Sequence, residues 1–169
     1  FSLLVLMAIT LTVIFIILAP KLLILFGASE KTLPYAVAYA RIYILGSIFV
    51  LIVLGMNPFI TTQGFAKISM LTTIIGAVIN IILDPIFIFV FNLGVKGAAI
   101  ATVLSQAFGA IWILRFLSGK KTILHLKKEN FKLEKEIILP CLALGISTFV
   151  MLSTESILSI SFTSSLSRY

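Results

Sequence analysis

The sequence contains little charge. Asp, Glu, Lys and Arg make up 11% of its 169 residues, whereas soluble domains carry roughly a quarter. Hydrophobic residues make up 60%, and the mean hydropathy is +1.21. This composition excludes an ordinary soluble domain and predicts a membrane protein. Because the apolar runs are continuous and do not alternate with polar residues, an outer-membrane β-barrel is excluded as well.

Residues used for metal binding and catalysis are also scarce. The single Cys141 allows no internal disulfide, and the single His125 cannot complete a zinc site. A zinc protease needs a His-Glu-x-x-His run, an intramembrane aspartyl protease needs a second aspartate beside Asp84, and a rhomboid-like protease needs a histidine inside a helix. Nothing resembles a phosphate-binding loop. We therefore expect no enzyme, no cofactor and no Cys/His metal centre.

Long apolar segments are abundant, and each is long enough to cross a bilayer as a helix. The predicted spans are Leu3–Pro20, Ile42–Thr62, Met70–Phe91, Gly97–Leu117 and Ile137–Ser161. The predicted fold is all-α, a polytopic transmembrane bundle of about five helices. The sequence starts inside an apolar run without a signal peptide, so we expect it to be part of a longer polytopic chain.

A charged stretch follows the fourth span. Residues 118–136, SGKKTILHLKKENFKLEKE, carry six lysines and three glutamates, which predicts a solvated linker. We expect no nucleic-acid binding, because glutamates interrupt the lysines. With Arg115 the stretch forms the densest basic cluster, and the positive-inside rule then predicts that it is cytoplasmic in a multi-pass cell-membrane protein. Residues 63–69 are predicted on the same side, and 21–34 and 92–96 on the outer side.

The third span carries the one aspartate of the sequence, Asp84, in NIILDPIFIFVF (80–91). A charged carboxylate at the bilayer centre costs about 2.5–3.5 kcal/mol on insertion scales and is a functional candidate by default. A polar stripe at helical spacing leads to it through Ser69, Thr72, Thr73, Gly76, Asn80 and Asp84. This stripe is predicted to face a bundle or a cavity, because lipid would leave its groups unsatisfied.

Pro85 leaves the Ile81 carbonyl without its usual partner and predicts a kink. With Asn80 and Asp84, the freed carbonyl would form an oxygen-rich pocket that can hold Na⁺, or a proton on the acid. The alternative is a kinked packing helix with a protonated, hydrogen-bonded Asp84.

Other polar residues lie within the remaining spans. Thr102 and Gln106, four residues apart, are predicted either to pack or to add a hydroxyl and an amide to the same interior. Asn57 precedes Pro58, which predicts a second kink, and Asn57 would either satisfy freed carbonyls or bind a ligand. Glu155 is the second intramembrane carboxylate, with a coupling or a structural role. A ridge of small residues for close helix packing is predicted at Gly97, Ala101, Ser105 and Gly109.

The stretch NPFITTQGFAKISMLTTIIGAVINIILDPIFIFVF, followed by NLGVKGAAIATVLSQ, resembles the fifth and sixth helices of the MATE (multidrug and toxic compound extrusion) family. The shared features are an asparagine, then an aspartate-proline pair, then G-V-x-G-A-A-x-A-T-x-x-S-Q. GASEKTLPYAVAYARIYILG is similar to the family's junction between helices three and four. The resemblance covers nearly the whole chain.

The resemblance implies part of a twelve-helix transporter with two lobes. Residues 1–118 would hold helices three to six of the N-terminal lobe, 119–136 the cytoplasmic linker, and 137–169 the first helix of the C-terminal lobe. It implies that Asp84 and Asn80 take part in coupling to Na⁺ or H⁺. Glu155 falls where some members carry a seventh-helix glutamate, although PCLALGIS lacks the family's usual proline after its glycine.

The implied function is a secondary antiporter in the lipid bilayer that exports lipophilic organic cations, with the missing helices on the same full-length chain. Two alternatives stay open. A related exporter of lipid-linked saccharides would be expected to carry several basic residues inside its helices. A non-transporting membrane scaffold would use Asp84 for packing alone.

Overall fold

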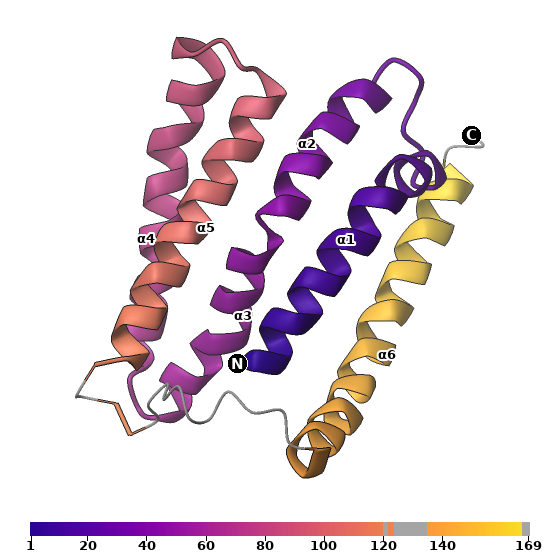
Figure 1. Cartoon of the computed structure of the whole chain (residues 1–169). Helices are drawn as coiled ribbons and strands as arrows, with labels where there is room; N and C mark the ends of the chain where they lie inside the picture. Colours follow the sequence, from indigo (N-terminus) through magenta and orange to yellow (C-terminus); the bar gives the residue numbers. More distant parts are fainter. Residues whose placement is uncertain (120–121, 124–134, 167–169) are drawn as a thin grey trace. The chain divides into compact units, whose positions relative to one another are not determined.

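The structure is a computed structural model that describes residues 1–119, 122–123 and 135–166. Every regular element in these residues is a helix (Figure 1), so the predicted all-α fold is confirmed. The chain divides into two units, Phe1–Phe131 and Lys132–Tyr169, and each is described by itself. Most of the predicted linker, with His125, lies outside the described residues, and its cytoplasmic location stays a prediction.

The first unit consists of three continuous helical spans and one bent pair of helices. Its elements are α1 (Ser2–Leu25), α2 (Leu33–Leu45), α3 (Ser47–Thr62), α4 (Ala66–Pro85), the π-helical η1 (Ile86–Val90) and α5 (Val95–Leu117). Successive spans run antiparallel (Figure 1). The α1–α2 and η1–α5 turns therefore lie at one end of the unit, and the α3–α4 turn lies at the other end with the last turn of α5.

The second unit contains α6 (Lys135–Leu166), which includes the predicted span Ile137–Ser161. Four described helical segments are long and apolar enough to cross a membrane, and the bent pair α2–α3 makes five if it is counted as one span. This number agrees with the prediction from the sequence. The assignment of the two units to two lobes of a transporter stays a prediction.

α5 is the central helix of the first unit and packs against α2, α3, α4 and η1. Its buried small residues allow the close approach: Gly97, Ala99, Ala101, Ser105, Gly109 and Ala110. The predicted small-residue ridge is part of this set. In a bilayer, helices associate through such close van der Waals packing, because lipid tails are as apolar as the side chains.

The second span is broken at Gly46, where α2 and α3 meet at an angle of 52°. A second kink is predicted at Asn57–Pro58; α3 continues through Pro58 to Thr62, and that kink stays a prediction. At Gly46, α5 approaches so closely that an added Cβ would overlap the side chain of Val103. The span also begins at Leu33, earlier than the predicted Ile42.

Polar groups at this break are satisfied by the neighbouring helix. The Thr12 hydroxyl of α1 lies 3.0 Å from the Ser47 hydroxyl and 3.4 Å from the Ile44 carbonyl oxygen. Breaks in a membrane helix persist where neighbouring side chains satisfy the freed backbone groups. Thr12 therefore holds α1 against the bend.

Pro85 ends α4, and the predicted irregularity takes the form of a π-helical turn. The Phe91 amide donates to the Ile86 carbonyl at 3.0 Å, in the i→i−5 pattern. Since proline has no N–H to donate, the Ile81 carbonyl loses its regular partner, and the π-helical turn follows directly after Pro85. The segment Ala66–Val90 still qualifies as one span.

Gly97 is where α5 meets backbone directly, because an added Cβ would lie 2.5 Å from the Phe87 carbonyl oxygen. We expect Gly97→Ala to destabilise the protein by about 1–3 kcal/mol, the usual result of overpacking, although alanine is the better helix former. Thermal unfolding in detergent, followed by circular dichroism, measures the effect. The control is Gly145→Ala in α6, whose Cβ meets nothing within 4 Å. Equal melting temperatures for Gly97→Ala and the wild type would contradict this account.

Candidate functional site

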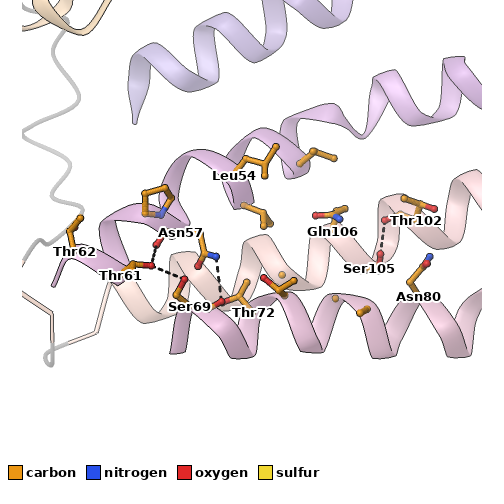
Figure 2. Close-up of a pocket in the computed structure, with 17 residues that line it drawn as sticks. Leu54, Asn57, Thr61, Thr62, Ser69, Thr72, Asn80, Thr102, Ser105 and Gln106 are labelled. Atoms are coloured by element: carbon orange, nitrogen blue, oxygen red, sulfur yellow. Dashed lines mark hydrogen bonds between the residues drawn. The ribbon is translucent and has the colours of Figure 1, made fainter. Parts of the chain in front are cut away.

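Helices α3, α4 and α5 line a cavity of about 710 Å³ (Figure 2). Drug-sized ligands occupy pockets of about 300–1,000 Å³. The cavity walls combine apolar side chains with uncharged polar ones: Asn57, Thr61, Thr62, Ser69, Thr72, Thr73, Asn80, Thr102, Ser105 and Gln106. None of the described residues that line it is charged. The site can therefore hold a large ligand through apolar contact and neutral hydrogen bonds.

The α4 wall is the predicted polar stripe, which reaches the cavity from Ser69 to Asn80. Asp84, the last member of the predicted stripe, is not among the residues that line the cavity, and its predicted coupling role stays a prediction. It lies one turn beyond Asn80, beside Pro85, and is half-buried. The Asn80 amide donates to Asp84 Oδ1 at 3.3 Å. Asn80 thus connects the cavity wall to the carboxylate.

The α5 wall contributes Thr102, Ser105 and Gln106. The hydroxyls of Thr102 and Ser105 donate to carbonyls of their own helix, Ala98 at 2.9 Å and Thr102 at 2.8 Å. Gln106 makes no hydrogen bond to any described residue, and Figure 2 shows its amide on the side of α5 that faces α3. This amide remains available to a ligand as both donor and acceptor.

The α3 wall contains Asn57, whose amide nitrogen donates to the Ser69 carbonyl of α4 at 3.3 Å. Its Oδ1 atom is buried and has no hydrogen-bond partner among the described residues. An unsatisfied buried acceptor costs about 1–3 kcal/mol, and water or a ligand commonly explains such a group. Asn57 therefore contributes a buried polar atom without a partner among the described residues of the wall.

Thr61 reinforces the contact between α3 and α4. Its hydroxyl donates to the Ser69 hydroxyl at 2.8 Å and lies 3.3 Å from the Asn57 carbonyl oxygen (Figure 2). Sequence reasoning missed Thr61, although its spacing of four residues from Asn57 places both on one helix face. Pro58, predicted as a kink, also lines the cavity.

Glu155 lies on α6 in the second unit, where it is exposed. The neighbouring hydroxyls of Thr154 and Ser156 donate to their own helix, to the Val150 and Leu152 carbonyls. The cavity is lined by residues of the first unit alone. Glu155 is therefore not one of its lining residues, and its coupling role stays a prediction.

A cation site would have to be built from few acidic groups. Within the described part of the chain, no group of three His, Cys, Asp or Glu side chains could hold a metal ion. Asp84 and Asn80 offer one carboxylate and one amide oxygen. These oxygens suit a hard cation or a proton, so the predicted Na⁺ or H⁺ chemistry is consistent with the ligand types.

Comparison with known proteins identifies relatives of this chain. The family model MatE matches residues 1–86, about half of the sequence. The multidrug export protein MepA of Staphylococcus saprophyticus is 32% identical over 127 residues, which are 75% of this chain and 28% of that protein. Its counterpart from Staphylococcus haemolyticus is 34% identical over 124 residues, 73% of this chain and 27% of that protein.

Solved structures give the same result for the fold. One is a multidrug resistance MATE family transporter of the MOP superfamily in the inward-facing conformation, with a TM-score of 0.77 and 29% identity. The alignment covers 85% of this chain and 33% of that one. A MOP superfamily transporter from Pyrococcus furiosus matches with a TM-score of 0.73 and 30% identity, over 80% and 30% of the two chains. The sequence thus spans about a third or less of these proteins.

The missing partner of Asn57 Oδ1 leads to a stability prediction. We expect Asn57→Leu to retain or raise the melting temperature, because removing the unsatisfied oxygen offsets the loss of the bond to Ser69. Thermal unfolding in detergent measures this. Ile60→Ala serves as the sensitivity control, since Ile60 is fully buried and truncation of such a residue costs about 2–5 kcal/mol. A melting temperature of Asn57→Leu as low as that of Ile60→Ala would overturn the interpretation.

Proposed function

The chain belongs to the MATE family, and from this membership we propose that the complete protein is a secondary antiporter that exports lipophilic organic cations in exchange for Na⁺ or H⁺. The observation that carries the proposal is the cavity of about 710 Å³ in the first unit, whose α4 wall leads through Asn80 to Asp84. The names of the staphylococcal relatives, multidrug export proteins, support a drug-like substrate.

The charged groups around the uncharged cavity wall favour a cation over an anion as the ligand. No lysine or arginine is among its described lining residues, so a phosphate or another anion would find no counter-charge. The nearest carboxylate in the chain of hydrogen bonds is Asp84, held by Asn80. A lipophilic cation would bury its apolar surface against α3 and α5 and be attracted by this carboxylate.

This distribution of charge also argues against the alternative of a lipid-linked saccharide exporter. Such a substrate carries phosphate, which arginine and lysine recognise through charge-assisted hydrogen bonds. The exposed cations Lys67 and Arg115 are near helix ends and are not part of the cavity wall. The drug antiporter is therefore the function that the site supports best.

Coupling follows from the carboxylate of Asp84. When Na⁺ or H⁺ binds Asp84, it neutralises the negative charge that attracts the organic cation. The drug is then bound less tightly, and the drug in turn weakens ion binding by the same factor, because coupling between two sites is reciprocal. Ions moving down their gradient thereby drive export, provided that the inward- and outward-open states bind the ion with different affinities.

The central test is Asp84→Asn in the complete protein, expressed in a drug-hypersensitive bacterium. We expect ethidium efflux to fall to the level of cells without the protein, because the amide keeps the shape but cannot be neutralised by an ion. Efflux is measured by fluorescence at matched membrane expression, with Na⁺ and pH varied separately to identify the ion. The control is Glu30→Gln, the same chemical change at an exposed residue outside the spans. Full efflux by Asp84→Asn would mean that Asp84 has only a packing role.

The cavity itself is tested by filling it. Gly76 of α4 faces the cavity, and an added Cβ there has its nearest atom at 3.9 Å, so a larger side chain would extend into the open space. We expect Gly76→Phe to weaken ethidium binding to the purified protein by at least about tenfold, or 1.4 kcal/mol. Fluorescence polarisation measures the affinity.

The matched control is Val78→Phe, on the same helix at an exposed position that does not line the cavity. It is expected to bind ethidium like the wild type. If both variants bind as tightly as the wild type, ethidium does not occupy this cavity.

A further inference from the structure

The end of the first unit at the α3–α4 turn is closed by a Schellman motif. Gly64 has a φ of +87°, the Phe65 amide donates to the Ile60 carbonyl at 3.2 Å, and the Gly64 amide donates to the Thr61 carbonyl at 3.0 Å. This pattern satisfies the last carbonyls of α3 and fixes the direction of the chain at its end. Gln63, the C-cap residue of α3, therefore occupies a defined position.

The Gln63 side chain is bonded through both halves of its amide. Its Nε2 atom donates to the Phe59 carbonyl of α3 at 2.7 Å, and its Oε1 atom accepts from the Ile123 amide at 2.9 Å. Ile123 follows α5 and is sixty residues away in the sequence. One side chain thus joins the end of α3 to the segment that leaves α5.

The segment that leaves α5 is folded back on the helix end. The Thr122 side chain is 3% exposed, and its hydroxyl donates to the Gly119 carbonyl at 3.0 Å. Ile123, in contrast, has an 81% exposed side chain. Since burial contributes little to holding Ile123, its backbone position depends on the bond to Gln63 and on the neighbouring Thr122.

A second contact at this end of the unit joins the start of α4 to the end of α5. The rings of Phe65, at the start of α4, and Phe116, in the last turn of α5, pack edge to face with centroids 5.3 Å apart. The ends of α3, α4 and α5 are therefore connected to one another, and all three helices are walls of the cavity. Asn57 and Thr61 line that cavity within the last two turns of α3, next to Gln63.

We propose that Gln63 is a positioning residue for transport, which ties the exit of the chain from α5 to the end of the α3 cavity wall. In the sequence, the residues after Ile123 lead to α6. When the α3 wall moves around a substrate, the hydrogen bonds of Gln63 transmit this movement to the start of the connection. The inference rests on the proposed transport function and adds a residue that touches neither substrate nor coupling ion.

The first test is hydrogen–deuterium exchange of the complete protein in nanodiscs, resolved to the Ile123 amide. Gln63→Leu removes both bonds at similar volume, and we expect Ile123 to exchange on the order of fivefold faster, as the loss of one net hydrogen bond implies. Gln63→Glu keeps an oxygen acceptor for the Ile123 amide but loses the donor to Phe59, so it is expected to retain more of the protection of Ile123 than Gln63→Leu does. Unchanged exchange in Gln63→Leu overturns the proposal.

A matched control separates the effect of the Gln63–Ile123 hydrogen bond from the effect of fraying at the end of α3. The Thr62 hydroxyl also donates to the Phe59 carbonyl, at 3.3 Å, but its hydrogen bond stays within α3. Thr62→Val is expected to leave exchange at Ile123 as in the wild type. Faster exchange at Ile123 in Thr62→Val would mean that fraying of α3, and not loss of the Gln63 bond, exposes the amide.

The second test is ethidium efflux by the same Gln63 variants. We expect Gln63→Leu to lower the maximal rate with little change in the half-saturating concentration, because the cavity is untouched. Gln63→Glu, which keeps the acceptor for Ile123, is expected to lower the rate less than Gln63→Leu. Wild-type efflux at Gln63→Leu, despite faster exchange at Ile123, would overturn a role in transport. Absence of efflux in the wild type would instead count against the proposed function, so the two failures are distinguishable.

Discussion

Inside a bilayer every backbone N–H and C=O must find a partner within the protein. The first unit has two places where the regular hydrogen bonds of a helix are interrupted. Pro85 interrupts the ladder of α4, and a π-helical turn continues the span. At Gly46 the α2–α3 span bends, and Thr12 of α1 approaches the Ile44 carbonyl. The first irregularity is accommodated within the span itself, and the second lies against a neighbouring helix.

The same constraint explains how much of this structure the sequence could predict. Uninterrupted hydrophobic length is a local property, and it located the four single spans and the α3 part of the bent pair. Helical periodicity also predicted the α4 wall, because Ser69, Thr72, Thr73, Gly76 and Asn80 repeat on one face. The hydrogen bond between Asn80 and Asp84 follows from their spacing of four residues.

Features that depend on a partner helix could not be predicted in this way. The break at Gly46 coincides with the close approach of Val103 from α5, whereas the stronger local signal, Pro58, lies within α3. Periodicity placed Asp84 on the same helix face as Asn80, but it could not show that the lining residues of α4 end at Asn80. The bond between Gln63 and Ile123 joins residues far apart in the sequence, which no periodicity could have indicated.

The packed face of α5 has a consequence for how the binding properties of this lineage can diversify. Gly109 and Ser105 both line the cavity, yet an added Cβ at Gly109 would lie 3.3 Å from Val53, and Ser105 is 2% exposed. Leu54, Thr73 and Ala77, in contrast, line it from exposed positions on α3 and α4. The packed part of the α5 wall is thus fixed by architecture, while these positions on α3 and α4 can vary. Substitutions that reshape the cavity should disturb helix packing less on α3 and α4 than at Ser105 and Gly109.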